Sequence, residues 1–212
     1  MKSSCEMKTL NSMGALIGNV IRKIALTQLD SWRPVAFSIG TNSNVISAGS
    51  NVYEDTVEFS SSLTSIHFTV NEDSTAKAIT LNTSCLQVAD LETANVKVFT
   101  RDEKDLSKEI LHTINGNINL TIFLRNGKGS YTAKENEKFL RESPETSAQI
   151  TNAVVYLNSR HCDILDPGFE VSKLEDEEII RFNIESLIDK TADSIVSECC
   201  GILYDSFASN YN

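Results

Sequence analysis

Two stretches of helical periodicity, one near each end of the chain, constrain its fold more than any other feature of the sequence. Apolar residues recur every three or four positions from Met13 to Ile24, with Leu29 a little beyond, and again from Ile188 to Leu203. This spacing aligns apolar side chains along one side of a helix, and that side must pack on another element. The sequence therefore predicts two long amphipathic helices, the first of which ends at Trp32–Pro34.

The region between the helices has the composition and the two-residue alternation of β-strands. The predicted strands are 35–39, 66–70, 78–81, 96–99, 118–124, 154–156 and 180–184. The run Asn126–Gly129 predicts a turn or bulge, and Asp166–Gly168 predicts a turn. A single chain could bury both helices on its own sheet, or two copies could bury them against each other.

Several polar stretches are predicted to lie outside this framework. Ser60–Ser62 predicts a turn, Arg101–Leu111 a solvent-exposed excursion, and Lys134–Thr146 a loop or weak helix. The acidic run Glu175–Glu178 is interpreted as a solvated stretch before a strand. His67 alternates with two apolar neighbours, which predicts a position at the surface or edge of a sheet.

Charge and cysteine content exclude several classes of function. The chain has 212 residues and a net charge of −10, from 19 basic and 29 acidic side chains, so we expect no strong direct binding to nucleic acid. The same charge disfavours an anionic membrane surface, and no apolar run approaches the length of a membrane-spanning helix. Five cysteines, an odd number without the spacing of a disulfide framework, predict reduced thiols in a reducing, intracellular compartment.

No stretch has the spacing of a catalytic or metal-binding motif. Gly127-Lys128-Gly129 lacks the spacing of a P-loop, and no Gly-x-Ser-x-Gly elbow occurs. His161-Cys162 and Cys199-Cys200 supply residue types that bind zinc, but without the usual Cys-x2-Cys spacing, so Cys199 is interpreted as a buried structural residue. We therefore expect no catalytic residue, no metal site and no cofactor.

The first helix carries two further features. Gly14 and Gly18 lie one turn apart, which favours close approach of a neighbouring element. Arg22 and Lys23 are adjacent cations on its polar side, and from the residues alone they fit either a solvated surface or a partner-binding site.

The segment Gly14–Leu26 resembles the signature helix in the N-terminal domain of RNA polymerase alpha subunits, roughly Gly-x-Thr-Leu-Gly-Asn-x-Leu-Arg-Arg-x-Leu-Leu. Gly14, Gly18, Asn19, Arg22 and Leu26 match this pattern, whereas Leu16 stands at the Thr position. Three less specific pieces follow in the order of the family, namely Thr80–Asn82, Leu124–Tyr131 and Ile180–Ser186.

The resemblance implies an α+β fold and a non-enzymatic scaffold in transcription. In this fold two long amphipathic helices pack on a sheet in a dimerisation unit, residues 1–43 plus 150–212, and residues 44–149 form an inserted β-rich subdomain. Two copies would form a homodimer that docks the beta and beta-prime subunits, with Arg22 and Lys23 at the docking site. The implied dimer interface comprises Met13, Leu16, Ile17, Val20, Ile21, Ile24, Ile195, Cys199 and Ile202, and the implied structural motif Gly14, Gly18, Asn19, Gly127 and Gly129.

The sequence also departs from this family. The family has a longer segment before the first helix than this sequence has, and it has a separate C-terminal DNA-binding domain that this sequence lacks. These differences favour an organelle-encoded or reduced-genome version of the subunit. Such a version would be located in a plastid or in bacterial cytoplasm. One alternative is the assembly subunit of archaeal or eukaryotic polymerases, which pairs with a shorter partner. A less favoured alternative is a small α+β enzyme that uses His161 or a cysteine.

Overall fold

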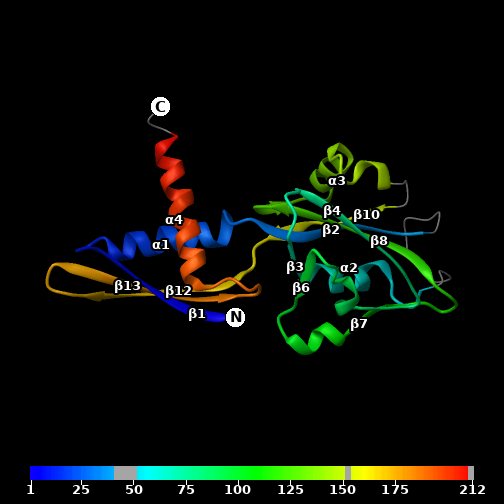
Figure 1. Ribbon diagram of the computed structural model, residues 1–212, viewed down its shortest axis with the longest axis horizontal. Coiled ribbons are helices and arrows are strands. Elements are labelled where there is room, and N and C mark those ends of the chain that lie inside the picture. Colours follow the sequence, from blue (N-terminus) through cyan, green and yellow to red (C-terminus); the bar gives the residue numbers. More distant parts are fainter. Residues whose placement is uncertain (41–51, 151–153, 210–212) are drawn as a thin grey trace. The chain divides into compact units, whose positions relative to one another are not determined.

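The computed structural model describes residues 1–40, 52–150 and 154–209, and these form two compact units. The first unit combines Met1–Asp30 with Cys162–Asn212, and the second is the continuous segment Ser31–His161 (Figure 1). Helices and strands are both present, which confirms the expected α+β class. The chain passes from one unit to the other at residues 30/31 and 161/162. Of the subdomain boundaries that the sequence predicts, 43/44 lies outside the described residues, and 149/150 lies twelve residues before the second of these crossings. Among the described residues, no helix combines the length and apolar character needed to cross a membrane.

The first unit is a three-stranded antiparallel sheet with two helices on one face (Figure 1). Its elements are β1 (Lys2–Leu10), α1 (Gly14–Thr27), β12 (Ile164–Lys173), β13 (Glu177–Ser186) and α4 (Ala192–Ala208). The strand order β1-β13-β12 joins the N-terminal strand to a strand near the end of the chain. Alternation along β13 points Ile180, Phe182 and Ile184 toward the helices, where they form the core with both helix stripes.

The opposite face of this sheet is charged. Three ion pairs cross from β1 to β13: Lys2 with Glu185 at 3.5 Å, Glu6 with Arg181 at 2.6 Å, and Lys8 with Glu177 at 3.1 Å. Exposed pairs of this kind contribute little to stability, because water screens them. Their main effect is that one face of the sheet favours water while the other packs against the helices.

The second unit is built on a six-stranded sheet. Its path is β4 (Ala76–Thr83), β8 (Ile118–Gly127), β2 (Ser31–Ile39), β3 (His67–Val70) and β6 (Val96–Phe99), and β10 (Val154–Tyr156) also pairs with β2. Strand β2 is buried along almost its whole length because it has partners on both edges and core on both faces. Helix α2 (Thr56–Thr64) contributes to the larger core and α3 (Ala133–Glu142) to the smaller one.

Two short ribbons and three short helices complete the described part of this unit. One ribbon pairs β5 (Cys85–Gln87) with β7 (Glu109–His112), and the other pairs β9 (Gly129–Tyr131) with β11 (Ser159–His161). The 3-10 helices are Val88–Leu91, Glu103–Ser107 and Ser147–Gln149.

Capping explains why two polar stretches are helical. Ser60–Ser62, expected in a turn, lie inside α2, because Asp55 and Glu58 form a capping box at its start. Thr132 and Glu135 form the same arrangement at the start of α3, so of the two alternatives expected for 134–146, a loop or a weak helix, the structure has a helix up to Glu142.

Three other expectations need correction. The excursion expected at 101–111 is exposed at most of its described positions, but it ends in the buried Ile110 and Leu111 on β7. Asp166–Gly168 is not a turn but part of β12. It follows a β-bulge, where the pairing with β13 shifts between Ile164 and Asp166. His67 is buried rather than at the surface or edge, on the strand face opposite to Phe68.

The first helix ends earlier than expected, at Thr27. Trp32–Pro34 lies within β2, where a register shift between Pro34 and Ala36 accommodates the missing proline N–H.

Candidate assembly surface on the two-helix unit

Helix α1 sits very close to its sheet because two positions lack a side chain. A Cβ added at Gly18 would lie 2.3 Å from Cε2 of Phe169, and one at Gly14 would lie 2.7 Å from Cγ1 of Val171. Both distances are shorter than real carbon contacts, so these glycines allow a separation that alanine would not. The one-turn spacing of the glycines thus has a packing role against β12.

A buried carboxylate fixes the start of the same helix. Glu178 Oε2 accepts a hydrogen bond from the backbone N–H of Gly14 at 2.7 Å, and only 3% of Glu178 is exposed. A negative charge at a helix N-terminus is favourable because the first N–H groups are unpaired and point at it. The expectation of a solvated acidic run is therefore wrong for Glu178, which alternation on β13 turns toward the helices.

The residues expected at a dimer interface fall into two groups. Ile21, Ile24, Ile195 and Cys199 are buried in the core of their own unit. The remainder are half-buried or exposed: Ile17, Val20, Ile202, Met13 and Leu16. The stripe of each helix therefore packs first on the sheet of its own chain.

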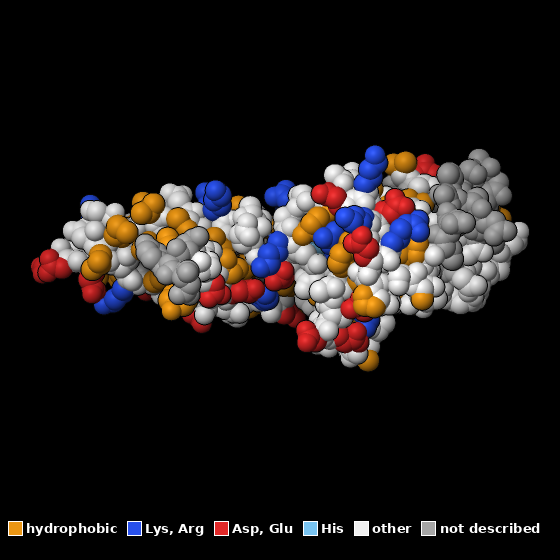
Figure 2. All heavy atoms as spheres, turned by 90° about the horizontal axis from the view of Figure 1, so that it is seen from above, with side chains coloured by type: hydrophobic (Ala, Val, Ile, Leu, Met, Phe, Trp, Pro, Cys, Tyr) orange, Lys and Arg blue, Asp and Glu red, His pale blue; other side chains and the backbone are white. Residues whose placement is uncertain are grey.

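Large apolar side chains are nevertheless exposed on both helices. Leu16 on α1 is 58% exposed, and on α4 Tyr204 is 72% and Phe207 61% exposed. The last turns of α4 extend past α1 and away from the sheet (Figure 1). Figure 2 looks onto the helix-covered side of this unit, where hydrophobic side chains gather. We call Met13, Leu16, Tyr204 and Phe207 the helix-face patch.

The sequence pointed to only half of this patch. Tyr204 and Phe207 were missed because they lie beyond the end of the predicted stripe, yet their spacing of three residues continues a helical face. The signal in the sequence that could have identified them is a pair of aromatic residues, three positions apart, just after the predicted apolar stripe.

The two adjacent cations lie on the outer side of α1. Arg22 and Lys23 are exposed, as is Asn19 one turn earlier, because Ile21 and Ala25 occupy the side that packs on the sheet. The pair therefore faces solvent, in a position that a partner protein can reach.

The glycines of the expected motif in the second unit belong to a packed turn. Gly129 has φ +70°, a conformation that favours glycine, and a Cβ at Gly127 would lie 2.8 Å from Cε2 of Tyr131. Beside this turn the guanidinium of Arg125 lies 3.5 Å from the ring centre of Tyr131 and 4.2 Å from that of Phe139. The turn thus holds its own aromatic and cationic side chains and lacks the form of a phosphate cradle.

The residues of the enzyme alternative have structural surroundings. Nδ1 of the buried His161 lies 2.7 Å from the carbonyl oxygen of Ser31, and Nε2 lies 3.0 Å from Oγ of Ser159, so both ring nitrogens are engaged. Burial raises the pKa of the Cys199 thiol to about 12, which disfavours the reactive thiolate. Neither residue is poised as a base or nucleophile.

One cluster of chemical groups was missed. Cys85, Glu109 and His112 bring a thiol, a carboxylate and an imidazole together on the ribbon of β5 and β7. The available signal was the Glu-x-x-His spacing of Glu109 and His112, which is not by itself specific.

Comparison with known proteins finds sequence similarity to one group of proteins, the alpha subunits of RNA polymerase. No protein-family model matches it. It is 28% identical to the DNA-directed RNA polymerase subunit alpha of Borrelia garinii subsp. bavariensis over 145 residues, which is 61% of this chain and 40% of that protein. The alpha subunits of Borreliella burgdorferi and Borreliella afzelii are each 26% identical over the same shares.

The match thus covers less than half the length of these relatives. All three are bacterial proteins, so they lend no support to the plastid origin that the sequence suggested. At the level of a family, the chain is similar to the alpha subunits of bacterial RNA polymerase.

Proposed function

We propose that this chain is an alpha-like, non-catalytic assembly subunit of a multisubunit RNA polymerase. The observation that carries the proposal is the similarity to three alpha subunits over 145 residues. The two-helix unit supports it, because the unit presents large exposed apolar side chains that a second copy could cover. Such a role would place the protein in the bacterial cytoplasm.

The proposed homodimer forms through the helix-face patch. Four of the residues expected at the interface instead form part of the core beneath the helices: Ile21, Ile24, Ile195 and Cys199. Direct contacts would come from Met13, Leu16, Tyr204 and Phe207, with the half-buried Ile17, Val20 and Ile202 at the margin. A permanent dimer of this kind typically buries more than about 2,000 Å² of accessible surface in total.

The oligomeric state tests this part of the proposal. We expect wild-type protein to have twice the chain mass of 23.4 kDa by sedimentation equilibrium. The double variant Leu16→Asp/Phe207→Asp places a charge on each helix, which a dry interface does not tolerate, so it is expected to sediment as a folded monomer.

Val57→Asp is the matched control, because Val57 is 75% exposed but lies on α2 in the second unit and is no part of the helix-face patch. Dissociation of the control to the same extent, or a monomeric wild type, would contradict the proposed interface. A complex with a shorter, different chain would instead favour the heterodimeric type of assembly subunit.

The docking of larger subunits is a separate part of the proposal. Arg22 and Lys23 are exposed on α1 and would pair with acidic groups of the beta or beta-prime subunit. In co-purification from the native host, Arg22→Ala/Lys23→Ala should retain the dimer but recover less of the large subunits. The double variant Lys134→Ala/Lys138→Ala, which removes two exposed cations from α3, should recover them fully. Equal recovery by both variants would remove the role given to Arg22 and Lys23.

A further inference from the structure

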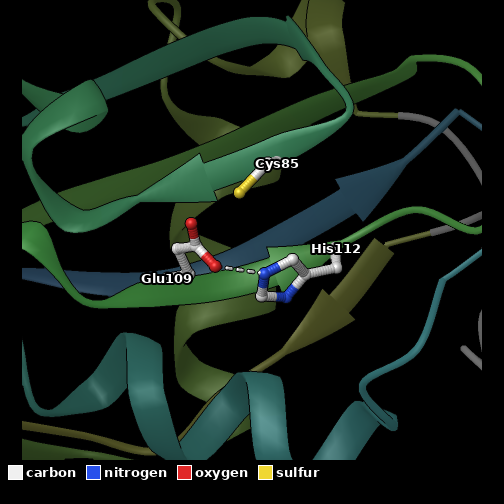
Figure 3. A group of neighbouring side chains, drawn as sticks. All are labelled: Cys85, Glu109 and His112. Carbon is white, nitrogen blue, oxygen red and sulfur yellow. Dashed lines mark hydrogen bonds and ion pairs between the residues drawn. The ribbon is translucent and has the colours of Figure 1, made fainter.

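Three potential metal ligands of different chemistry converge on the ribbon of β5 and β7. The donor atoms of Cys85, Glu109 and His112 all lie within 4.8 Å of one another (Figure 3). His112 is directly opposite Cys85 in the strand pairing, which brings their side chains to the same face of the ribbon.

A bulge brings the third group to this face. The pairing shifts between Leu86 and Gln87, so two consecutive residues of β7, Ile110 and Leu111, both turn into the core. Without the shift, Glu109 and His112 would point to opposite faces, because they are three residues apart on one strand. Bulges characteristically redirect a side chain in this way.

A fourth residue orients the histidine. Oε1 of Glu54 lies 2.7 Å from Nδ1 of His112, and Oε2 accepts the backbone N–H of the same residue at 2.7 Å. This leaves Nε2 of His112 directed at Oε2 of Glu109, at 2.5 Å. A carboxylate that holds one ring nitrogen while the other faces a ligand position is the usual support of a metal-bound histidine.

The donor set and its spacing suit zinc. Thiolate, imidazole and carboxylate are all ligands of Zn²⁺, and tetrahedral bonds of about 2.0–2.3 Å place ligand atoms roughly 3.3–3.7 Å apart. The present separations, between 2.5 Å and 4.8 Å, bracket that range, so side-chain rotations are enough to reach it. The side chain of His112 is 37% exposed and that of Glu109 48%, which leaves an entry path for an ion.

The charges at the cluster also favour a cation. The carboxylates of Glu54 and Glu109 lie on either side of the imidazole of His112, at 2.7 Å and 2.5 Å from its two ring nitrogens. A divalent ion would compensate these carboxylates and displace the thiol proton of Cys85.

We propose that Cys85, Glu109 and His112 bind one Zn²⁺ ion, with Glu54 as a positioning residue and water in the fourth position. The ion ties β5 to β7 and, through Glu54, to the segment before α2. This site is independent of the proposed function, because it lies in the second unit and includes no residue of the helix-face patch.

Cobalt substitution tests the site on the full chain. We expect metal-free protein to bind one equivalent of Co²⁺ with the near-ultraviolet absorption of a thiolate–cobalt bond and the intense visible bands of tetrahedral cobalt. Zn²⁺ should displace the cobalt and remove both signals. Cys85→Ser should lose the thiolate absorption, and His112→Gln or Glu109→Gln should weaken binding at least tenfold.

The matched control is Cys5→Ser, which removes another half-buried thiol, located in the first unit. It should retain the spectrum and affinity of the wild type. Glu54→Gln should weaken binding by about 10–100-fold while the thiolate absorption at saturation persists, as expected for a residue that acts through His112.

Absence of the thiolate absorption in wild type, or its survival in Cys85→Ser, would overturn the site. Its loss in the Cys5→Ser control would do the same. Circular dichroism of each metal-free variant checks folding, and Zn²⁺ should raise the melting temperature of the wild type but not of folded Cys85→Ser. Dimer mass and recovery of large subunits, measured separately, decide the proposed function.

Discussion

At the scale of single residues, the packing of the first unit depends on two positions without a side chain, Gly14 and Gly18. Gly18 allows α1 to rest directly on the ring of Phe169, and Gly14 leaves room for Val171 and Glu178. The sequence made close packing at these glycines predictable from their spacing. It could not identify the neighbours, because β12 follows α1 by more than a hundred residues.

Replacement of Gly18 by alanine should destabilise the protein. The added methyl group would lie 2.3 Å from an aromatic carbon, so α1 or Phe169 must shift, at a cost of about 1–3 kcal/mol in the free energy of unfolding. Urea denaturation followed by circular dichroism measures this change.

Gly201→Ala is the matched control on α4, because no atom lies within 4 Å of its added Cβ. Helix propensity predicts a gain of up to about 1 kcal/mol for this variant. Gly18→Ala as stable as Gly201→Ala would show that the packing of α1 is looser than described.

At the scale of elements, strongly periodic segments were predictable and polar ones were not. The two long helices and strands such as Val96–Phe99 follow from spacing alone. Helix α3 was assigned as a loop or weak helix because its polar side chains hide a short buried side, which consists of Asn136 and Leu140. Buried Asn136 also donates to the carbonyl oxygen of Leu157, a contact between distant segments that local spacing cannot reveal.

The capping box of α3 gives a test at this scale. Thr132→Ala removes the hydroxyl that accepts from the N–H of Glu135, so we expect a loss of about 1 kcal/mol in the free energy of unfolding. Thr132→Ser keeps the hydroxyl and should remain close to wild type. Chemical denaturation of both variants compares them, and equal losses would show that the cap is not what stabilises the helix.

At the scale of the whole molecule, the amphipathic stripes left open whether they pack within one chain or between two. In the structure, the most deeply buried residues of the stripes pack within one chain, since Ile21 and Ile195 lie in the core of the first unit. Periodicity cannot separate these cases, because both require the same apolar spacing. The ligand cluster on β5 and β7 was equally inaccessible, since a bulge in the strand pairing creates it.

A charge at Ile21 should therefore unfold the first unit rather than release intact monomers. Ile21→Asp buries a carboxylate among aliphatic side chains, at a cost of more than about 3 kcal/mol. Amide hydrogen exchange should accelerate in α1 and α4, whereas Ile21→Val should change it little.

The single tryptophan, Trp32, reports on the second unit alone, because it is buried in the larger core there. Its fluorescence should keep the native emission in Ile21→Asp if the two cores are independent. A red-shifted emission would show instead that both units unfold as one cooperative body.

The pairing of β1 with β13 has a consequence for biosynthesis. The second unit is one uninterrupted segment, so all of its strands have been translated when residue 161 is made. The first thirty residues must wait for Glu177–Ser186 before β1 has a partner. Nascent α1 therefore leaves the ribosome with its apolar stripe uncovered, and apolar surface exposed in this way during synthesis promotes aggregation.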